Sequence, residues 1–329
     1  MKKSKLARLI AAICCFAMLL TACSSNQTPA ETGGDGSTTA DSEKKVLTYA
    51  IGAETTDLST LYMNNSLYCT SKLVYENLVD FDNGEIVPGL AESWEYNDDQ
   101  TELTFHLRQG VTFHNGEPFN AEAVKTNLEH KQSNPSFYSL KGITDIQEIE
   151  VVDEYTITLH YDHPFYAYLQ DFCWPDVNPM SAPEYIIPGD FQTISGVAGT
   201  GPYIYDEYVA GEYTRFVRNE DYWGETPYWD EIIVKYIPDS TSRLQALQTG
   251  EIDMIYGGTL LTYEEYDQAL AMDGIDGQMA EKDTRVQVIT TNATSPYLSD
   301  IRVRQAIAYA IDKEEMSVAI SNGYEPPAD

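Results

Sequence analysis

Basic residues are scarce in this chain, whose 329 residues include 20 Lys and Arg against 52 Asp and Glu. The formal net charge at pH 7 is therefore −32. A surface this acidic repels polyanions, which argues against nucleic acid as a partner. The same charge slightly favours cationic ligands, although the net charge of a chain does not describe an individual pocket.

The signature motifs of common hydrolases, metalloproteases and thiol sites are also missing. Downstream of residue 22 the sequence contains no HExxH, GxSxG or CxxC motif. His160 and His163 lie at the end of an expected strand, where a spacing of three residues directs their side chains to opposite faces. Residues 80–85 (DFDNGE) begin like a calcium loop, but the glycine comes one place early and the twelfth position is Ala91. We expect a turn at residues 80–85, and we predict no metal and no cofactor.

One apolar run stands out, Leu9–Leu20, which follows a basic stretch and is short for a bilayer span. Residues 1–22 are therefore predicted to be an export signal peptide. The sequence at its end, Leu20-Thr21-Ala22-Cys23, resembles the lipobox of bacterial lipoproteins, in which the peptide is cut before a cysteine that carries a diacylglyceryl group. An ordinary signal peptide with an incidental cysteine is the alternative. We favour lipidation of Cys23, because a tether rich in Ser, Thr and Gly follows directly.

The predicted anchor places the folded region outside the cytoplasm, in a periplasmic space or on the outer face of a Gram-positive membrane. Each buried acyl methylene contributes about 0.8 kcal/mol, so two or more chains hold a protein at a membrane where one chain does not. Two cysteines remain after Cys23, namely Cys69 and Cys173. They could form one disulfide in this compartment, but isolated thiols are more often small core residues, which is the interpretation we favour.

The stretch FHNGEPFNAEAV, residues 113–124, has the composition of a catalytic site. Its polar residues nevertheless have structural tasks, because Asn115-Gly116 is a turn signal, Asn120 suits a helix N-cap and Glu122 suits the first helical turn. No nucleophile stands beside His114. We predict that the stretch joins an extended segment to a helix and has no catalytic role.

Strand and helix patterns alternate along the chain. Strands are expected within residues 45–54, 92–110 and 149–161, and residues 67–79 carry apolar residues with helical spacing. Leu103, Phe105 and Leu107 alternate with polar residues, which places His106 on a solvated face.

The second half begins with a strand, a helix and a strand. The strands are residues 231–237 and 252–256, and the helix is capped by Asp239 or Ser240 and ended by Gly250. A further strand is expected at residues 286–290.

Two helices are expected to follow that strand. The first is capped by Ser299 or Asp300 and places Val303, Ile307 and Ile311 on one face. The second starts at a capping box formed by Asp312 and Glu315.

Three segments together resemble a known family. They are VPGLAESWEYNDDQTELTFHLRQGVTFHNGEPFNAEAV, GTGPYIYDEYVAGEYTRFVRNEDYWG continuing to IPDSTSRLQALQTGEIDMI, and DIRVRQAIAYAIDKEEM. In this order they resemble the family 5 extracellular solute-binding proteins of ABC transporters, the receptors for dipeptides, oligopeptides and nickel. The resemblance covers the chain from about residue 46 to its end.

The resemblance implies an α/β fold of the periplasmic-binding-protein type (class II, cluster C), with two lobes and an additional α+β subdomain in the first lobe. In the family the second lobe extends well beyond the portion present here, so we expect a C-terminally truncated chain with an incomplete second lobe. The implied regions are the lipoprotein signal peptide (1–22), the lipidated cysteine and flexible linker (23–45), the first segment of the first lobe (46–83), its subdomain (84–195), its second segment (196–286) and the start of the second lobe (287–329).

The resemblance also implies ligand contacts. In the nickel branch the segment after the first strand lines the cleft, and Tyr62, Met63 and Leu67 match those positions approximately; packing within a loop is the alternative. Trp174 could be a cleft aromatic or a core residue.

The nickel branch also uses two arginines to hold an anionic chelator. One falls at Asp176 here and the other near Phe137-Tyr138, where no arginine occurs, which counts against a nickel chelate. Asp176 could instead pair with a ligand cation such as the ammonium group of a peptide, and a solvated loop acid is the simpler interpretation.

The resemblance implies that the protein is not an enzyme. In proteins of this family two lobes close on a ligand, and the closed form docks on a permease. We therefore predict a lipid-anchored, monomeric receptor that captures dipeptides or oligopeptides and delivers them to ABC transporter permease subunits. A nickel-chelate receptor of the same family is the first alternative. An extracellular hydrolase or a sensor unconnected to transport is more remote.

Overall fold

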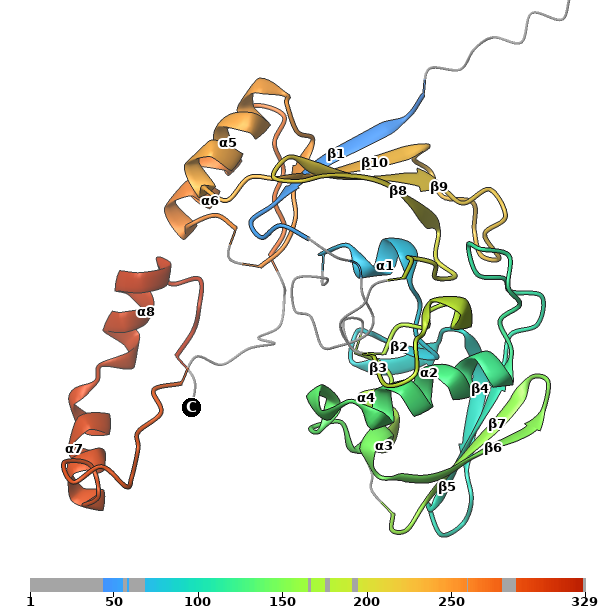
Figure 1. The fold of residues 1–329 in the computed structure, drawn as a ribbon. Coiled ribbons are helices and arrows are strands. Elements are labelled where there is room, and N and C mark those ends of the chain that lie inside the picture. Colours follow the sequence, from blue (N-terminus) through green and yellow to red (C-terminus); the bar gives the residue numbers. More distant parts are fainter. Residues whose placement is uncertain are drawn as a thin grey trace, which may run out of the picture. The chain divides into compact units, whose positions relative to one another are not determined.

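The computed structural model describes residues 44–55, 58, 69–164, 167–174, 178–190, 195–258, 260–279 and 288–327. The strands among these residues form three sheets (Figure 1). The mixed α/β composition that the sequence predicts is confirmed.

The five-stranded sheet has the order β11-β1-β10-β9-β8. Its strands are β1 (Val46–Ile51), β8 (Tyr203–Val209), β9 (Tyr213–Arg218), β10 (Glu231–Tyr236) and β11 (Met254–Ile255). β1 runs parallel to both of its neighbours, whereas β8, β9 and β10 pair antiparallel. A strand with partners on both sides is shielded from water, which explains why the predicted strand at residues 45–54 is so apolar.

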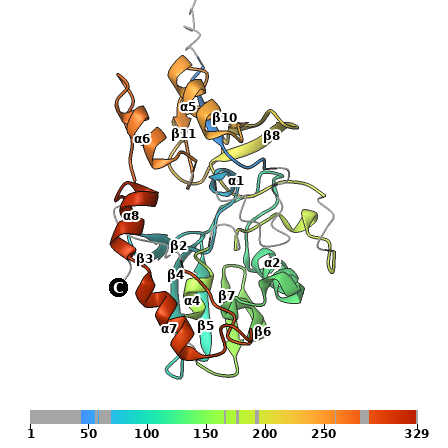
Figure 2. The same ribbon diagram turned by 90° about the vertical axis from the view of Figure 1, so that its left-hand side faces the viewer.

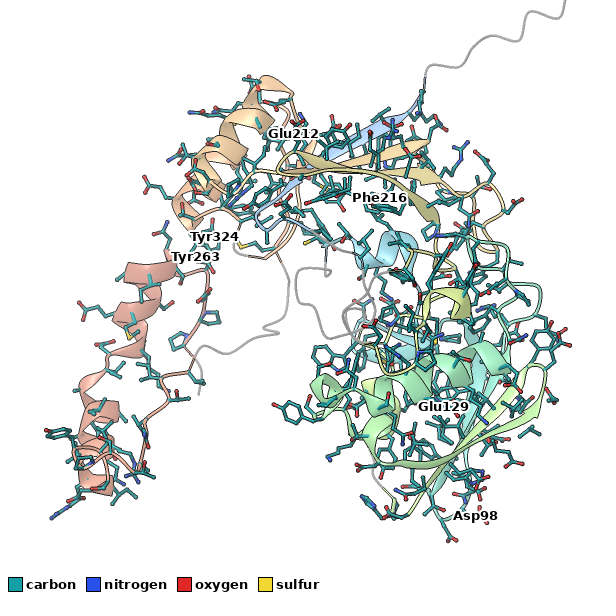
Figure 3. All side chains as sticks on the ribbon, viewed as in Figure 1. Asp98, Glu129, Glu212, Phe216, Tyr263 and Tyr324 are labelled. Carbon is teal, nitrogen blue, oxygen red and sulfur yellow. The ribbon has the colours of Figure 1, made fainter. Side chains whose placement is uncertain are left out.

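Each face of this sheet covers a separate core, because successive side chains of β1 point to opposite faces. One core includes Tyr49, Ile51, Val74, Tyr75 and Phe216. The other includes Ala50, Ala246 and Ile252. The first core lies next to α1 (Ser71–Val74), and Phe216 projects into it from β9 (Figure 3).

The second core is covered by α5 (Ser240–Thr249), which lies beside β11 (Figure 2). Asp239 caps this helix, because its side chain accepts a hydrogen bond from the amide of Ser242, and Gly250 ends it with a φ of 72°. The predicted strand–helix–strand unit is therefore confirmed. Its second strand has only two residues, and β1 separates it from β10.

The four-stranded sheet is antiparallel in the order β4-β5-β7-β6. Its strands are β4 (Ala91–Tyr96), β5 (Glu102–Leu107), β6 (Ile146–Asp153) and β7 (Thr156–Tyr161). α2 (Ala121–Ser133) packs against β6 and β7, and α3 (Lys141–Thr144) packs against α4 (Tyr168–Asp171) (Figure 1). The alternation in β5 is confirmed, because Phe105 is buried and His106 is partly exposed beside Glu95.

A two-stranded hairpin, β2 (Val79–Asp82) with β3 (Glu85–Pro88), contains the turn predicted at residues 80–85. Asn83 and Gly84 have φ values of 51° and 89°. Two consecutive left-handed residues are typical of a tight hairpin turn, in which asparagine and glycine carry the least strain. The calcium-like sequence is therefore a turn.

The stretch 113–124 is structural, as predicted. The side chain of Asn120 accepts a hydrogen bond of 3.0 Å from the amide of Ala123 at the start of α2. His114 Nε2 lies 2.9 Å from the carbonyl oxygen of Gly201. Burial lowers the pKa of His114, so the neutral ring donates through Nε2 to this carbonyl.

Two predicted elements differ in the structure. The helix expected within residues 67–79 is only the single turn α1. Leu78 is buried, but it lies beyond the end of this helix. The strand expected at residues 286–290 is wrong over its described residues, because residues 288–290 have no strand pairing and Val288 is 71% exposed. An apolar alternation forms a strand only where a neighbouring strand completes its hydrogen bonds.

The remaining helices lie between and after the sheets in sequence, and most of them begin at a capping side chain. They are α6 (Tyr263–Leu270), α7 (Ile301–Ala310), α8 (Lys313–Ser321) and the 3₁₀ turns η2 (Pro135–Phe137) and η3 (Pro183–Tyr185). Asp300 and Asp312 cap α7 and α8 as predicted, and Asp312 accepts from the amide of Glu315, which is one of the two bonds of the predicted capping box. Val303 and Ile307 remain partly exposed. No helix in the described ranges combines the length and apolar character that a membrane crossing requires.

Both predicted core cysteines are free thiols. Cys173 is buried in the core of the four-stranded sheet, and Cys69 packs against the core that contains Tyr49. The interpretation as core residues rather than a disulfide is therefore confirmed.

Candidate ligand-binding site

The parallel strands β1 and β11 end next to each other and lead into loops. Ligands of α/β proteins commonly lie outside the carboxyl ends of such strands. A Cβ atom added at Gly52, after β1, would lie 2.8 Å from a side-chain carbon of Leu260. One added at Gly257, after β11, would lie 3.0 Å from the sulfur of Cys69. Glycine at both positions lets three chain segments meet at this edge of the sheet.

Four of the predicted ligand contacts lie outside the described residues. Tyr62, Met63 and Leu67 belong to the segment 59–68, and Asp176 lies between Trp174 and Asn178. Cys23, the predicted lipidation site, also lies outside the described residues.

The residues at both ends of the segment 59–68 are held by buried phenols. The hydroxyl of Tyr75 donates to the carbonyl oxygen of Leu58 over 2.7 Å. The hydroxyl of Tyr49 donates to the carbonyl oxygen of Cys69 over 2.7 Å. Burial raises the pKa of Tyr49, so its hydroxyl keeps the proton that it donates. The entry and exit of the predicted ligand segment are therefore fixed to the sheet and to α1.

Arg243 joins two further segments at the same edge. Its side chain is buried and donates to the carbonyl oxygens of Ile237 and Leu260, the latter over 2.9 Å from Nε. Burial lowers the pKa of Arg243. Because these donors are directed at backbone carbonyls, Arg243 stabilises the loops.

The second predicted ligand region is the loop 174–178. Trp174 is 53% exposed, so it is not a core residue, while its role in ligand binding stays a prediction. The amide of Asn178 donates to the carbonyl oxygen of Trp174 over 3.0 Å, and its side-chain amide donates to the carbonyl oxygen of Asp171 over 2.7 Å. The two ends of this loop, Trp174 and Asn178, are thus bonded to each other, and Asn178 is also bonded to Asp171.

Glu76 connects the two regions. Its carbonyl oxygen accepts a hydrogen bond of 2.9 Å from the amide of Met180, just after the loop 174–178. Its carboxylate accepts three more bonds at 2.7–2.8 Å, which come from Thr200, Tyr222 and Trp223. Burial raises the pKa of Glu76, and these three donors oppose that rise.

Sequence reasoning did not find Tyr49, Tyr75 or Glu76. Glu76 binds Trp223 across 147 residues of sequence, and Tyr75 and Leu58 are 17 apart. No periodic pattern spans such separations, so the only signal was that DYWG and GTGP, which supply the partners of Glu76, lie in the segments that resemble a family.

His160 lies in β7, whereas His163 comes after that strand has ended at Tyr161. His160 lies between Glu102 and Glu150, and His163 contacts Asp162. Over the described stretches of the chain, no group of three or more His, Cys, Asp or Glu residues is placed to hold a metal ion.

The phenol anchors lead to a prediction. Tyr75→Phe and Tyr49→Phe are each expected to lower the free energy of unfolding by about 1–2 kcal/mol, because each leaves a buried carbonyl oxygen without its donor. Urea denaturation measures this change, and hydrogen exchange should accelerate near residues 58 and 69. Tyr228→Phe is the control, since Tyr228 is largely exposed and keeps its ring under Lys45. Equal stability of all three variants would contradict the anchor role.

Comparison with known proteins identifies relatives over most of the chain. The family model described as bacterial extracellular solute-binding proteins, family 5 middle, matches residues 85–329. The nickel-binding periplasmic protein of Escherichia coli (strain K12) is 32% identical over 265 residues, which are 78% of this chain and 49% of that protein. The chain thus spans about half the length of this curated relative.

Solved structures agree with the family match. NikA from Brucella suis in complex with Fe(III)-EDTA has a TM-score of 0.77 and 32% identity, covering 84% of this chain and 56% of that one. DppA from Helicobacter pylori in complex with peptide STSA has a TM-score of 0.68 and 26% identity, covering 85% and 59%. The described fold is therefore that of two-lobed periplasmic binding proteins of this type.

Proposed function

The chain belongs to the bacterial extracellular solute-binding proteins of family 5, and from this premise we propose that it is the ligand-capturing receptor of an ABC importer. Proteins of this family are extracytoplasmic transport receptors rather than enzymes. The observation that carries the proposal is the family match over residues 85–329. The fixed ends of the segment 59–68 and of the loop 174–178 support it, because a receptor needs ligand-contacting loops on rigid supports.

A peptide is the ligand that we propose. Its support is the absence of arginine where an anionic chelate would need one, since Asp176 occupies one such position and Phe137-Tyr138 the other. Phe137 is buried and Tyr138 is 76% exposed, so an aromatic surface rather than a cation is available there. Trp174 and Asp176 would contact the peptide, with Asp176 facing its ammonium group, and Tyr62, Met63 and Leu67 would line the opposite wall.

The anchor and the regions of the chain belong to the same proposal. Lipidated Cys23 would hold a monomeric receptor at the membrane, where it meets the permease subunits. The boundaries 46–83, 84–195, 196–286 and 287–329 are supported by the sheets, because strands β4 to β7 all lie within 84–195. The β2–β3 hairpin crosses the first of these boundaries.

Native mass spectrometry of the full gene product tests the proposal. With Cys23→Ser the protein should be released from the membrane, and its native mass should exceed its denatured mass by that of one peptide. Loss of the adduct in Trp174→Ala, with the adduct retained in the control Trp229→Phe, would place the peptide at the loop 174–178. A protein that carries no adduct and binds no peptide added at millimolar concentration would contradict the proposal.

A nickel chelate is the second candidate, because the nickel-binding relative is 32% identical over 265 residues. A nickel-sized adduct that EDTA removes would favour it over a peptide.

A further inference from the structure

Two helices that are distant in sequence meet through tyrosine rings. Tyr324, which follows α8, stacks on Tyr263 of α6 with ring centroids 5.3 Å apart and an interplanar angle of 16°. It also meets the ring of Tyr266, one turn further along α6, at 5.9 Å and 86°. Both geometries are favourable for aromatic pairs. Tyr324 thus contacts two rings of α6, and Figure 3 labels the stacked pair.

Each ring of the stacked pair is also bonded to a carboxylate of the opposite segment. The hydroxyl of Tyr263 donates to the side chain of Glu325, and the hydroxyl of Tyr324 donates to Asp267 over 2.5 Å. The bond to Glu325 is the main cause that raises the pKa of Tyr263 to about 12, so this phenol keeps its proton at neutral pH. Hydrogen bonds to an ionised acceptor are about twice as strong as neutral ones, so the exchanged bonds favour this arrangement of the rings.

α6 is firmly attached to the five-stranded sheet. Thr262 and Glu265 form a capping box at its start. The carboxylate of Glu265 also accepts hydrogen bonds of 2.9 Å from the hydroxyls of Ser240 and Thr241, at the start of α5. Because α5 covers one face of that sheet, the tyrosines of α6 are held in the region 196–286.

Tyr324 is fixed in the same way to α8. Asn322 and Gly323 have φ values of 50° and 82°, and two consecutive left-handed residues reverse the chain directly after the helix. The amide of Tyr324 donates to the carbonyl oxygen of Ser321 over 2.9 Å, and the amide of Glu325 donates to Oγ of Ser321 over 3.1 Å. The turn that carries both residues is therefore part of the region 287–329.

We propose that these residues form a latch between the two lobes, which holds the lobes together around a bound ligand. The inference rests on the proposed receptor function, in which the region 196–286 belongs to the first lobe and the region 287–329 to the second. The members of the latch are Tyr263, Tyr266, Asp267, Tyr324 and Glu325.

The position of α6 explains why the latch favours the closed form. Between β11 and α6 lies Leu260, which Arg243 holds at the carboxyl edge of β1 and β11, where the candidate ligand site lies. A contact between lobes at this edge forms when the lobes come together. It therefore lowers the free energy of the closed form and leaves that of the open form unchanged.

A latch of this kind contributes affinity without touching the ligand. Release of the ligand requires the lobes to open, so the stacked rings and both exchanged hydrogen bonds must first separate. Capture begins from the open form, in which the latch is not made. Loss of the latch should therefore raise the dissociation rate constant and leave the association rate constant nearly unchanged.

The test uses the full gene product carrying Cys23→Ser, with trialanine as the peptide probe and stopped-flow fluorescence as the measurement. Tyr324→Ala removes the stacked ring and one bond, and should raise the dissociation rate constant about tenfold. Tyr324→Phe keeps the ring and loses only the bond to Asp267, so its rate should lie between those of Tyr324→Ala and the wild type. Tyr309→Ala, on α7, is the matched control, because Tyr309 is 90% exposed, and it should match the wild type.

Hydrogen exchange of α6 provides a readout without ligand. Exchange of residues 263–270 should be faster in Tyr324→Ala than in the wild type or Tyr309→Ala, although the substitution lies outside α6. A Tyr324→Ala protein that keeps wild-type exchange in α6, or that releases trialanine at the wild-type rate, overturns the inference. If the exchange result is as expected but neither trialanine nor any other peptide binds to the wild type, the contact between α6 and the end of α8 stands and the proposed function fails.

Discussion

Gly199→Ala is expected to lower the free energy of unfolding by about 3 kcal/mol or more, because the added methyl group would overlap the backbone of α1. A Cβ atom at this position would lie 2.0 Å from the carbonyl oxygen of Val74 and 2.6 Å from the ring of Tyr75. The obstacle at 2.0 Å is backbone, so no side-chain rotation relieves it. The whole segment would have to move away from α1.

The segment around Gly199 cannot move freely because it is bonded on several sides. The carbonyl oxygen of Gly199 accepts from the amide of His114 over 2.8 Å, and the amide of Gly201 donates to the carbonyl oxygen of Val74 over 2.9 Å. Displacement would break these bonds together. Since Val74 is followed by Tyr75 and Glu76, the same displacement would also strain the hydrogen bonds of Tyr75 to Leu58 and of Glu76 to Met180.

Urea denaturation measures the loss, and Gly258→Ala is the matched control. A Cβ atom at Gly258 would meet no other atom within 4 Å. We expect the control to remain within about 0.5 kcal/mol of the wild type. A Gly199→Ala protein as stable as the control would show that the close approach to α1 is not a constraint.

Glu76→Ala is expected to cost about 3 kcal/mol of unfolding free energy. The substitution removes the acceptor of three donors at once, those of Thr200, Tyr222 and Trp223. An unmade hydrogen bond at a buried donor costs about 1–3 kcal/mol, and partial access of water reduces the sum of three such losses. Glu129→Ala is the control, because Glu129 is an exposed residue of α2 with only a 3.9 Å ion pair to Lys125, which contributes little.

Glu76→Gln separates the charge from the hydrogen bonds. Because burial raises the pKa of Glu76 in the folded protein above its usual 4.5, the folded state binds this proton more firmly than the unfolded state does. The associated stability is fully present below pH 4.5 and is lost as the pH rises through the raised pKa. Unfolding experiments between pH 4 and 7 should therefore show the variant gaining stability relative to the wild type as the pH rises. A difference in unfolding free energy between the two proteins that stays constant from pH 4 to 7 would contradict a raised pKa of Glu76.

These variants act on one junction. α1 and Glu76 follow the segment 59–68, the segment 199–201 lies against α1, and residues 178–181 are bonded to Glu76 and to α2. The hydrogen bonds of this junction therefore connect described residues next to both predicted ligand regions.

Much of the fold followed from the sequence, because caps and alternation act over a few residues. Asn120, Asp239, Asp300 and Asp312 each accept a hydrogen bond from an amide two or three residues ahead, so a local pattern identified four helix starts. The alternation around Phe105 likewise reported its burial. Residues 288–290 show the limit of this reasoning, since apolar alternation does not supply a partner strand.

The ligand regions show a different limit. The resemblance to a family pointed to residues 62–67 and 174–176, but the groups that bond to the described residues on either side of them were invisible to sequence reasoning. Lys131 is an example, because its burial and its hydrogen bond to the carbonyl oxygen of Pro179, 48 residues away, are seen only in the folded chain.

The sequence by itself determined the acidic character of the chain, its helix caps and its family resemblance, and it alone carries the predicted export signal and lipid anchor at Cys23. These properties depend on composition, on neighbouring residues or on segments that can be compared directly. The tertiary structure alone decided that Tyr49 and Tyr75 bond to the residues that flank one predicted ligand region and that Glu76 bonds to a residue just after the other. The physical reason is that a buried polar group must be satisfied by whatever the folded chain places beside it, and that partner can lie anywhere in the sequence.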